Sequence, residues 1–229
     1  MSNKPIGIIG AMQIEIEGLK KEMTEVSEVT VSGVCFTVGK LCGREVVCAV
    51  CGVGKVFAAI AAEAMILHFG VGALLNTGVA GGLAEGLCVG DIVIADAVVQ
   101  HDMDTSPLGD PVGLLSGIER VTLEADAALS AALEKAALQC GLSPRRGIVA
   151  TGDQFIASNA QKTRIRELFG AAACEMEGGA IGHVAFVNRV PFAVLRAISD
   201  DGDGMEFSEF VSLAAARSVA VTRAFVTLI

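Results

Sequence analysis

Apolar segments of two lengths alternate along the 229-residue chain, and this pattern predicts strands interleaved with helices. Short continuous apolar runs predict buried strands at 5–10, 73–77, 91–99, 147–150, 171–174 and 192–200. Longer segments with one apolar side predict helices at 14–23, 56–69, 123–139, 161–168, 175–187 and 208–228. Such alternation over the whole length favours an α/β fold with a mixed, mostly parallel sheet between helix layers.

Three β-rich runs near the N-terminus, at 26–31, 35–38 and 45–50, depart from this alternation. They are separated by Ser32-Gly33 and Cys42-Gly43, a spacing typical of hairpins, so we expect antiparallel neighbours. The helix at 14–23 is expected to be amphipathic, with Ile14, Gly18 and Leu19 on one side and its acids on the other.

Glycine-rich or acidic turns follow five predicted strands, after Ile9, Val50, Thr77, Ala150 and Ile198. Ligands of α/β sheets bind at the carboxyl ends of strands, so one pocket could collect all five turns. The polar segment 100–117 is long for a loop in a compact chain, which favours a functional or interfacial role.

The composition indicates a single domain over residues 1–229, since 52% of residues are apolar and no linker-like tract interrupts them. The chain has 17 Lys and Arg against 26 Asp and Glu, a net charge of −9, which disfavours binding to nucleic acid or an anionic membrane. No apolar run predicts a membrane span, and the N-terminus lacks the pattern of a signal peptide. We therefore expect a cytoplasmic protein.

The seven cysteines are odd in number and mostly lie in apolar runs, so they are interpreted as reduced core thiols. Cys48 and Cys51 have CxxC spacing, but residues three apart on a strand face opposite sides, and no second pair accompanies them. We expect no metal and no cofactor.

Candidate chemistry lies in acids at the ends of apolar segments: Glu15, Glu175, Glu177 and Asp200. A carboxylate held at the end of a buried strand can have a raised pKa and act as an acid or base. Each could instead be a cap or an ion-pair partner, because Arg196 lies inside an apolar strand and needs an acid. The basic residues nearby are too few for all of these acids, so some should remain free in a cleft.

Loop residue Phe155, beside Gly152 and Asp153, could stack on a planar ligand or simply fill the core. The glycine turns, of which Gly52-Val-Gly54-Lys55 is the nearest to a phosphate loop, do not match the known phosphate-binding patterns.

Six motifs in order carry a resemblance to a known family: Gly7-Ile-Ile-Gly10-Ala-Met12-x-x-Glu15, Gly52-Val-Gly-Lys55-Val, Asn76-Thr-Gly-Val-Ala-Gly-Gly82, Gly152-Asp-Gln-Phe155, Glu175-Met-Glu177 and Arg196-Ala-Ile-Ser-Asp200. Over essentially all 229 residues the chain resembles bacterial 5′-methylthioadenosine/S-adenosylhomocysteine nucleosidases. The resemblance implies a three-layer α/β/α, nucleoside-phosphorylase-like domain with a central mixed, twisted sheet, acting as a homodimer in methionine salvage. It also implies hydrolysis of the N-glycosidic bond of both nucleosides, and of 5′-deoxyadenosine, with release of adenine.

The same resemblance assigns roles at matching positions. Asp200, oriented by Ser199, would protonate adenine N7. Glu15 would activate the attacking water, which Arg196 helps to position. Glu177 would bind the ribose hydroxyls.

The remaining implied contacts concern the two ends of the substrate. Phe155 would stack on the base and the Ile156 backbone would read its edge. The rest of the implied substrate site comprises Met12, Val53, Val79, Ala80, Gly81, Glu175, Met176 and Phe207, with the loop around Leu108 reaching the site of the partner subunit. Two features depart from the family: Val79 stands where many members carry Ser or Thr, and the segment between Asp200 and Phe207 is short.

Three alternatives stay open. A phosphate-dependent purine nucleoside phosphorylase of the same fold would need a basic phosphate site, whereas the candidate turns here are acidic. An aminodeoxyfutalosine nucleosidase of menaquinone synthesis shares these residues. A nucleoside sensor without catalysis is disfavoured by the joint presence of Glu15, Glu177 and Asp200.

Overall fold

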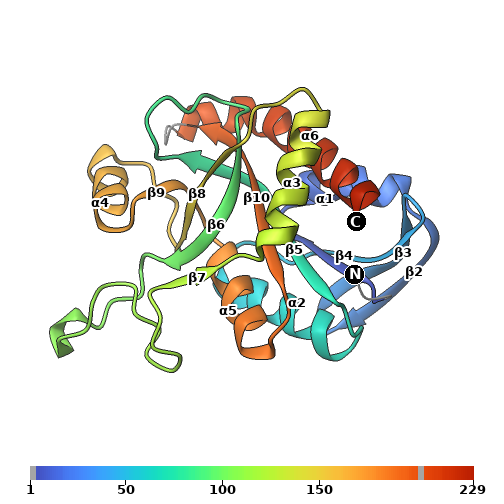
Figure 1. The fold of residues 1–229 in the computed structure, drawn as a ribbon, viewed down its shortest axis with the longest axis horizontal. Coiled ribbons are helices and arrows are strands. Elements are labelled where there is room, and N and C mark those ends of the chain that lie inside the picture. Colours follow the sequence, from blue (N-terminus) through green and yellow to red (C-terminus); the bar gives the residue numbers. More distant parts are fainter. Residues whose placement is uncertain (1–3, 201–203) are drawn as a thin grey trace.

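A twisted β-sheet with helices on both faces forms the centre of the molecule (Figure 1). The structure, a computed structural model, describes residues 4–200 and 204–229, with the backbone alone at 204–208. The strands are β1 (Ile6–Gly10), β2 (Thr24–Val31), β3 (Val34–Leu41), β4 (Arg44–Val50), β5 (Ala73–Gly82), β6 (Ile92–Gln100), β7 (Thr122–Glu124), β8 (Arg145–Thr151), β9 (Ala171–Glu175) and β10 (Phe192–Asp200).

Part of this sheet closes on itself. Strands β10, β6, β8, β9 and β5 each pair with the next, and β5 pairs back with β10. Beyond the ring, β1 and β4 continue from β5 in parallel, and the predicted antiparallel hairpins β2–β3–β4 complete the sheet. The expectation of a mostly parallel sheet was wrong, because the ten described strand pairings divide into five parallel and five antiparallel.

The strands of the ring run in two opposite directions. β10 and β5 share one direction with β1 and β4, while β6, β8 and β9 share the other. The carboxyl ends of the two sets meet where Gly81 of β5 lies opposite Cys174 of β9. A site at this seam can therefore receive side chains from the ends of strands that approach it from both sides.

Helices cover the sheet in two layers, as predicted. On one face, α1 (Gln13–Glu22), α3 (Ala127–Gln139) and α6 (Gly204–Leu228) enclose one core cluster. On the other face, α2 (Lys55–Leu67) and α5 (Gly178–Asn188) pack against each other and enclose a second. Figure 1 shows α4 (Asn159–Phe169) to one side, near β8 and β9, and the short helix η1 (Ser106–Leu108) in the long loop after β6.

Two helices begin later than predicted, because side chains cap their first turns. Asp126 accepts hydrogen bonds from the amides of Ala128 and Leu129, so α3 begins at Ala127 and the preceding residues form β7. Glu175 ends β9 and accepts the amides of Glu177 and Gly178, so α5 begins only at Gly178.

Two other predictions need correction. The segment Gly78–Gly82 continues β5 as a strand instead of forming a turn, because it pairs with β10. In α1, Ile14 is 39% exposed, and Ile16 joins Leu19 in facing the core.

The segment Glu209–Leu228 of α6 is long and apolar enough to cross a membrane by length and composition alone. In the structure α6 packs on β5, β10, α1 and α3, and it places Val221, Phe225 and Val226 in the core. Core helices of soluble proteins pass the same test of length and composition, so one such helix is weak evidence for a membrane span.

The cysteines divide by position. Cys48, Cys51 and Cys174 are buried, whereas Cys35, Cys42, Cys88 and Cys140 are exposed, so the prediction of mostly core thiols holds only for the first three. Cys48 and Cys51 belong to core clusters on opposite faces of the sheet, as their spacing predicted.

Candidate active site

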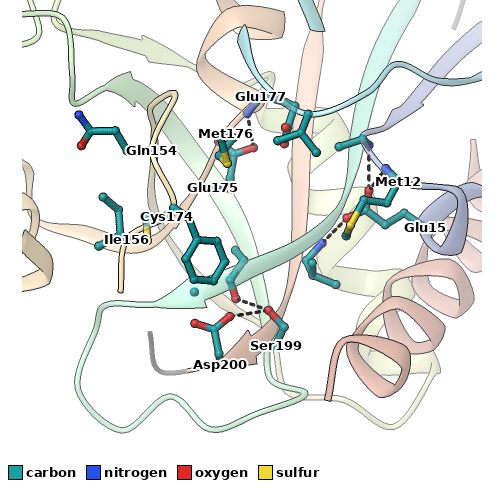
Figure 2. A pocket seen from close by; sticks show the side chains of 16 residues that line it. Met12, Glu15, Gln154, Ile156, Cys174, Glu175, Met176, Glu177, Ser199 and Asp200 are labelled. Carbon is teal, nitrogen blue, oxygen red and sulfur yellow. Dashed lines mark hydrogen bonds between the residues drawn. The ribbon is translucent and has the colours of Figure 1, made fainter. Parts of the chain in front are cut away.

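A cavity of about 280 Å³ lies at the seam between the two sets of strands. Its volume is close to the lower end of the range for small-molecule sites. In Figure 2, Met12 and Glu15 lie on one side of the cavity and Gln154 and Ile156 on the opposite side. The lining residues are Ala11, Met12, Glu15, Val53, Val79, Ala80, Gly81, Gln154, Phe155, Ile156, Cys174, Glu175, Met176, Glu177, Ser199 and Asp200.

These residues come from the ends of six strands or the segments that directly follow them. The ends of β1, β4, β5, β8 and β10 contribute, as the sequence pattern predicted, and β9 adds Cys174 to Glu177. The cavity therefore forms where parallel strands of both sets terminate.

Glu15 is buried at the start of α1, one turn after β1. Its Oε2 accepts hydrogen bonds from the amides of Ala11 and Met12, both at 2.8 Å, and its Oε1 accepts the amide of Val79 at 2.9 Å. Burial raises the pKa of the Glu15 carboxyl, while the Arg196 guanidinium and the three amide bonds oppose that rise. The result is a rigidly held carboxylate whose affinity for a proton exceeds that of an ordinary glutamate.

Gly78 on β5 makes this placement possible. A Cβ atom at that position would lie 2.4 Å from Glu15 Oε1 and 2.8 Å from Arg196 Nη1. Both neighbours are charged groups fixed by other bonds, so the strand needs a residue without a side chain here.

Arg196 is fully buried in β10, and its charge is balanced mainly by Glu175. Its Nη2 donates to Glu175 Oε2 and to Asn76 Oδ1, and it lies 3.9 Å from Glu177 Oε2. Burial alone would lower the pKa of Arg196, but Glu175, Glu177 and Glu15 outweigh it and raise that pKa. Arg196 therefore remains cationic, and it lies behind the cavity instead of in its lining.

Glu175 is the acid that the buried arginine requires. Besides Arg196 it binds the Thr151 hydroxyl through Oε1 and the amides of Glu177 and Gly178 through Oε2, the latter at 2.7 Å. Its oxygens are thus occupied by internal donors. The prediction that one of the candidate acids serves structure applies to Glu175.

Glu177 precedes α5 and has fewer partners. Its Oε1 accepts the amide of Gly54 at 2.9 Å. Burial, followed by the nearby Glu175 carboxylate, raises the pKa of Glu177 to about 7, although Arg196 and the Gly54 amide oppose that rise. This carboxyl faces the cavity and can change its protonation near neutral pH.

Asp200 ends β10 and is 2% exposed. The Ser199 hydroxyl donates to Asp200 Oδ2 at 2.8 Å, and Figure 2 shows this bond beside the cavity. A Cβ on Gly81 would lie 3.3 Å from Asp200 Oδ1 and 3.4 Å from Cys174 Sγ, so the carboxyl and the thiol flank the same glycine. Burial and the neighbouring Asp200 raise the pKa of Cys174 to about 12, which keeps this thiol protonated.

The loop after β8 supplies an apolar wall. Phe155 lines the cavity and is 51% exposed, whereas Ile156 is buried at 6% exposure. The Phe155 ring therefore forms part of the cavity wall and of the outer surface, and a planar ligand could cover its exposed part.

Most residues predicted for the site meet in this cavity, with three exceptions. Arg196 lies behind it, and Leu108, in η1, is 83% exposed and outside the lining. The Phe207 side chain lies outside the described residues. Sequence reasoning did not name Ala11, Gln154 and Cys174 as site residues; Ala11 and Gln154 lie inside two of the quoted motifs and Cys174 directly precedes a third, and this position was the available signal.

Two observations limit the chemistry of the cavity. Within the described part of the chain, no group of three or more His, Cys, Asp and Glu side chains is arranged to hold a metal ion. The lining residues named above include four carboxylates and no Lys or Arg. The chemistry of the cavity is therefore that of carboxyl groups beside an apolar wall.

Comparison with known proteins agrees with this geometry. The family model of the phosphorylase superfamily matches residues 5–227. A 5′-methylthioadenosine/S-adenosylhomocysteine nucleosidase from Shewanella pealeana is 39% identical over 90% of this chain and 91% of its own. The crystal structure of the nucleosidase of that name from Neisseria meningitidis, in complex with methylthio-immucillin-A, superposes with a TM-score of 0.95 at 35% identity, covering 99% of this chain and 100% of that one.

A second solved structure, the futalosine hydrolase of Helicobacter pylori, superposes with a TM-score of 0.94 at 33% identity, covering 99% of this chain and 98% of the other. The nucleoside-phosphorylase-like fold expected from the sequence is thus confirmed. The chain belongs to the phosphorylase superfamily and, within it, to the 5′-methylthioadenosine/S-adenosylhomocysteine nucleosidases.

Proposed function

We propose that the chain hydrolyses the N-glycosidic bond of 5′-methylthioadenosine and S-adenosylhomocysteine, releasing adenine and the thioribose. The observation that carries the proposal is the placement of Glu15, Glu177 and Asp200 around one cavity in a chain of this family. 5′-Deoxyadenosine, which differs only at the 5′ substituent, is a further expected substrate.

Asp200 is proposed as the general acid. Adenine leaves readily only when N7 carries a proton, so the reaction needs an acid beside the base. Asp200 is buried in the lining of the cavity, and Ser199 fixes the orientation of its carboxyl. Donation of its proton to N7 lets the C1′–N9 electron pair move onto the base as that bond breaks.

Glu15 is proposed as the base that takes a proton from the attacking water. The new bond forms between the water oxygen and C1′, and Glu15 receives the released proton. Three amide donors fix its carboxylate, and burial raises its pKa, which favours proton acceptance. Separate acid and base carboxyls on two sides of the sugar are typical of inverting hydrolysis.

Glu177 is proposed to bind the ribose hydroxyls, since it faces the cavity and retains acceptor capacity beyond the Gly54 amide. Arg196 is proposed to act from its position behind the cavity, where it holds Glu175 and balances the negative charge of Glu15 and Glu177. Developing positive charge on the sugar would be stabilised by the remaining carboxylates.

The substrate would lie with its base and its tail at opposite ends of the cavity. Phe155 and the backbone of Ile156 hold the adenine, while Met12, Val53 and Met176 contact the sugar and the thioalkyl group. Phe207 is a further predicted contact of the ribose and the thioalkyl group, and the loop around Leu108 is predicted to contribute to the site of the partner subunit. Val79 contributes its amide to Glu15 and an apolar surface to the cavity, so the absent hydroxyl should be tolerated.

The cavity lining and the relatives also bear on two other nucleoside reactions. Phosphorolysis would require cationic groups for phosphate, and the described cavity lining has none. Hydrolysis of aminodeoxyfutalosine is not favoured, because relatives about 40% identical over most of the chain are named 5′-methylthioadenosine/S-adenosylhomocysteine nucleosidases, whereas the futalosine hydrolase of Helicobacter pylori is 33% identical.

The acting unit is proposed to be a homodimer in which residues 1–229 form one domain. Val56 and Phe57, on the first turn of α2, are 70% and 53% exposed, and they adjoin cavity residue Val53, itself 51% exposed. A second copy would cover this apolar surface. Light scattering coupled to size exclusion would measure the mass, and a monomer would contradict this assembly.

A cytoplasmic location is proposed from the family, the acidic composition and the free thiols.

A substrate panel tests the proposed activity. Methylthioadenosine, S-adenosylhomocysteine, 5′-deoxyadenosine, adenosine, inosine and aminodeoxyfutalosine would each be incubated with the protein while free base is quantified. Fast release of adenine from the first two supports the proposal. Release from aminodeoxyfutalosine alone, or from none of the panel, would contradict it.

A further inference from the structure

A closed ring of hydrogen bonds joins Lys55, Asp102 and Asp153, which are far apart in sequence. The Lys55 Nζ donates to Asp102 Oδ1 at 2.7 Å, and the Asp153 amide donates to Asp102 Oδ2 at 2.9 Å. The Lys55 amide donates to Asp153 Oδ1 at 2.8 Å, which closes the ring. Neither aspartate belongs to the cavity lining, nor does Lys55, so the proposed chemistry leaves the ring unexplained.

The ring connects three loops around the cavity. Lys55 follows the turn that carries Val53 and Gly54, and Asp153 precedes Gln154 and Phe155 in the loop after β8. Asp102 lies at the start of the long loop after β6. Two of the connected loops therefore carry lining residues of the cavity.

The partly buried position of the ring makes it more than a surface ion pair. The Lys55 and Asp102 side chains are only 20% and 16% exposed. Burial would raise the pKa of Asp102, but the hydrogen bonds from Lys55 and the Asp153 amide outweigh this and lower it. Exposed pairs contribute little because solvent screens them, whereas shielded charge-assisted bonds hold their geometry.

The ring also determines where the Gly54 backbone lies. Gly54 has a φ of 104°, and a Cβ there would lie 3.0 Å from Asp153 Oδ1, so the aspartate packs directly against this backbone. The amide of Gly54 donates to Glu177 Oε1. Movement of Asp153 would therefore displace the donor that orients Glu177.

We propose that Lys55, Asp102 and Asp153 are positioning residues, which hold the Gly54 amide on Glu177 and the Phe155 loop against the cavity. They set the affinity for the nucleoside without touching it. This inference rests on the proposed function, because it assigns these residues to the nucleoside site.

The charge state of Glu177 supplies a readout that a purely structural role would not change. The Gly54 amide is one of the two interactions that lower the pKa of Glu177, so its displacement would raise that pKa. The acid limb of the profile of kcat/KM against pH should then move to higher pH. The other charged or titratable groups that act on Glu177 are Glu175 of β9, Arg196 of β10, Glu15 of α1 and Cys51 after β4.

The test compares two ring variants with two controls. Asp153→Ala removes the acceptor for the Lys55 amide, and Lys55→Met removes the ammonium while keeping the apolar stem. Each should raise KM for methylthioadenosine about tenfold, the effect of roughly one lost hydrogen bond, with a smaller fall in kcat. Asp153→Asn keeps an oxygen acceptor and should stay near wild type. Lys40→Met breaks the Lys40–Glu25 pair on the hairpin and should change nothing.

The affinity for adenine, measured by titration calorimetry, separates this inference from the proposed activity. Thermal unfolding of each variant identifies any that fails to fold, in which case the other ring variant decides. Weakened adenine binding in Lys55→Met but not in Lys40→Met supports the ring even if the wild type hydrolyses no nucleoside. The inference would be overturned if the wild type is active and the folded ring variants keep its KM, its acid limb and its affinity for adenine. Equal defects in Asp153→Asn and Asp153→Ala would overturn it as well.

Discussion

Three glutamates lie around Arg196, and their partners give each a different chemical character. Glu175 is occupied by the guanidinium, a hydroxyl and two amides, so it serves as a fixed counter-charge. Glu15 accepts three amides and faces the cavity. Glu177 accepts one amide at Oε1, and its pKa is raised to about 7. Identical side chains thus differ because their donors differ.

The first prediction concerns Asp200. Asp200→Asn retains the size of the side chain and an acceptor for Ser199 but cannot donate a carboxylic proton to the base. We expect kcat for adenine release to fall by roughly 10²–10⁴-fold while thermal unfolding changes little. The assay is spectrophotometric adenine release at saturating methylthioadenosine. Turnover at the wild-type rate would show that the general acid is another group.

The second prediction concerns the stability cost of Glu177. Its folded-state pKa of about 7 lies above its usual 4.5, so the wild type loses stability as pH rises through this interval. Glu177→Gln keeps the acceptor for Gly54 and removes the buried charge. As the pH rises from 4.5 to 7, the unfolding free energy of the wild type should therefore fall relative to that of Glu177→Gln by up to about 3 kcal/mol.

Urea unfolding at several pH values measures this difference. The same variant should bind the ribose less well, with a raised KM for methylthioadenosine. A constant difference in unfolding free energy across the pH range would mean that the Glu177 pKa is not raised by folding.

At the scale of elements, the strands were predicted more accurately than the helix starts. Continuous apolar runs identified β1, β6 and β10 because both faces of these strands are covered by helices. The starts of α3 and α5 were missed, since the carboxylates of Asp126 and Glu175 cap them through specific bonds that apolar periodicity does not contain. The glycines after Thr77 suggested a turn, but they allow β5 to pass close to buried charges.

The third prediction follows from that close passage. Gly78→Ala places a methyl group where Glu15 Oε1 and Arg196 Nη1 now lie, so both charged groups must move. A displacement of about 1 Å in a catalytic group costs on the order of 10²-fold in rate, and we expect a loss of kcat of this size.

Gly117→Ala is the matched control, because no atom lies within 4 Å of a Cβ there. Both variants would be assayed for adenine release after a circular-dichroism check of folding. A Gly78→Ala enzyme with the kcat of the Gly117→Ala control would show that Glu15 does not need its present position.

At the scale of the whole molecule, the closure of the sheet brings the site together. The pairing of Gly81 with Cys174 joins the ends of two oppositely running sets of strands, and no local pattern predicts a contact between segments so distant in sequence. The motifs identified the carboxylates, because acids at strand ends have a chemical signature. Gln154 and Cys174 have none, and the ring of Lys55, Asp102 and Asp153 depends on loop positions that only the fold determines.

The identity of the nucleophile tests the central claim most directly. Methylthioadenosine would be turned over in ¹⁸O-water with and without inorganic phosphate, and the sugar product would be analysed by mass spectrometry. The carboxylate-lined cavity predicts phosphate-independent adenine release and a sugar that carries one ¹⁸O at C1. Adenine release that requires phosphate and yields a sugar 1-phosphate would contradict the proposed hydrolysis.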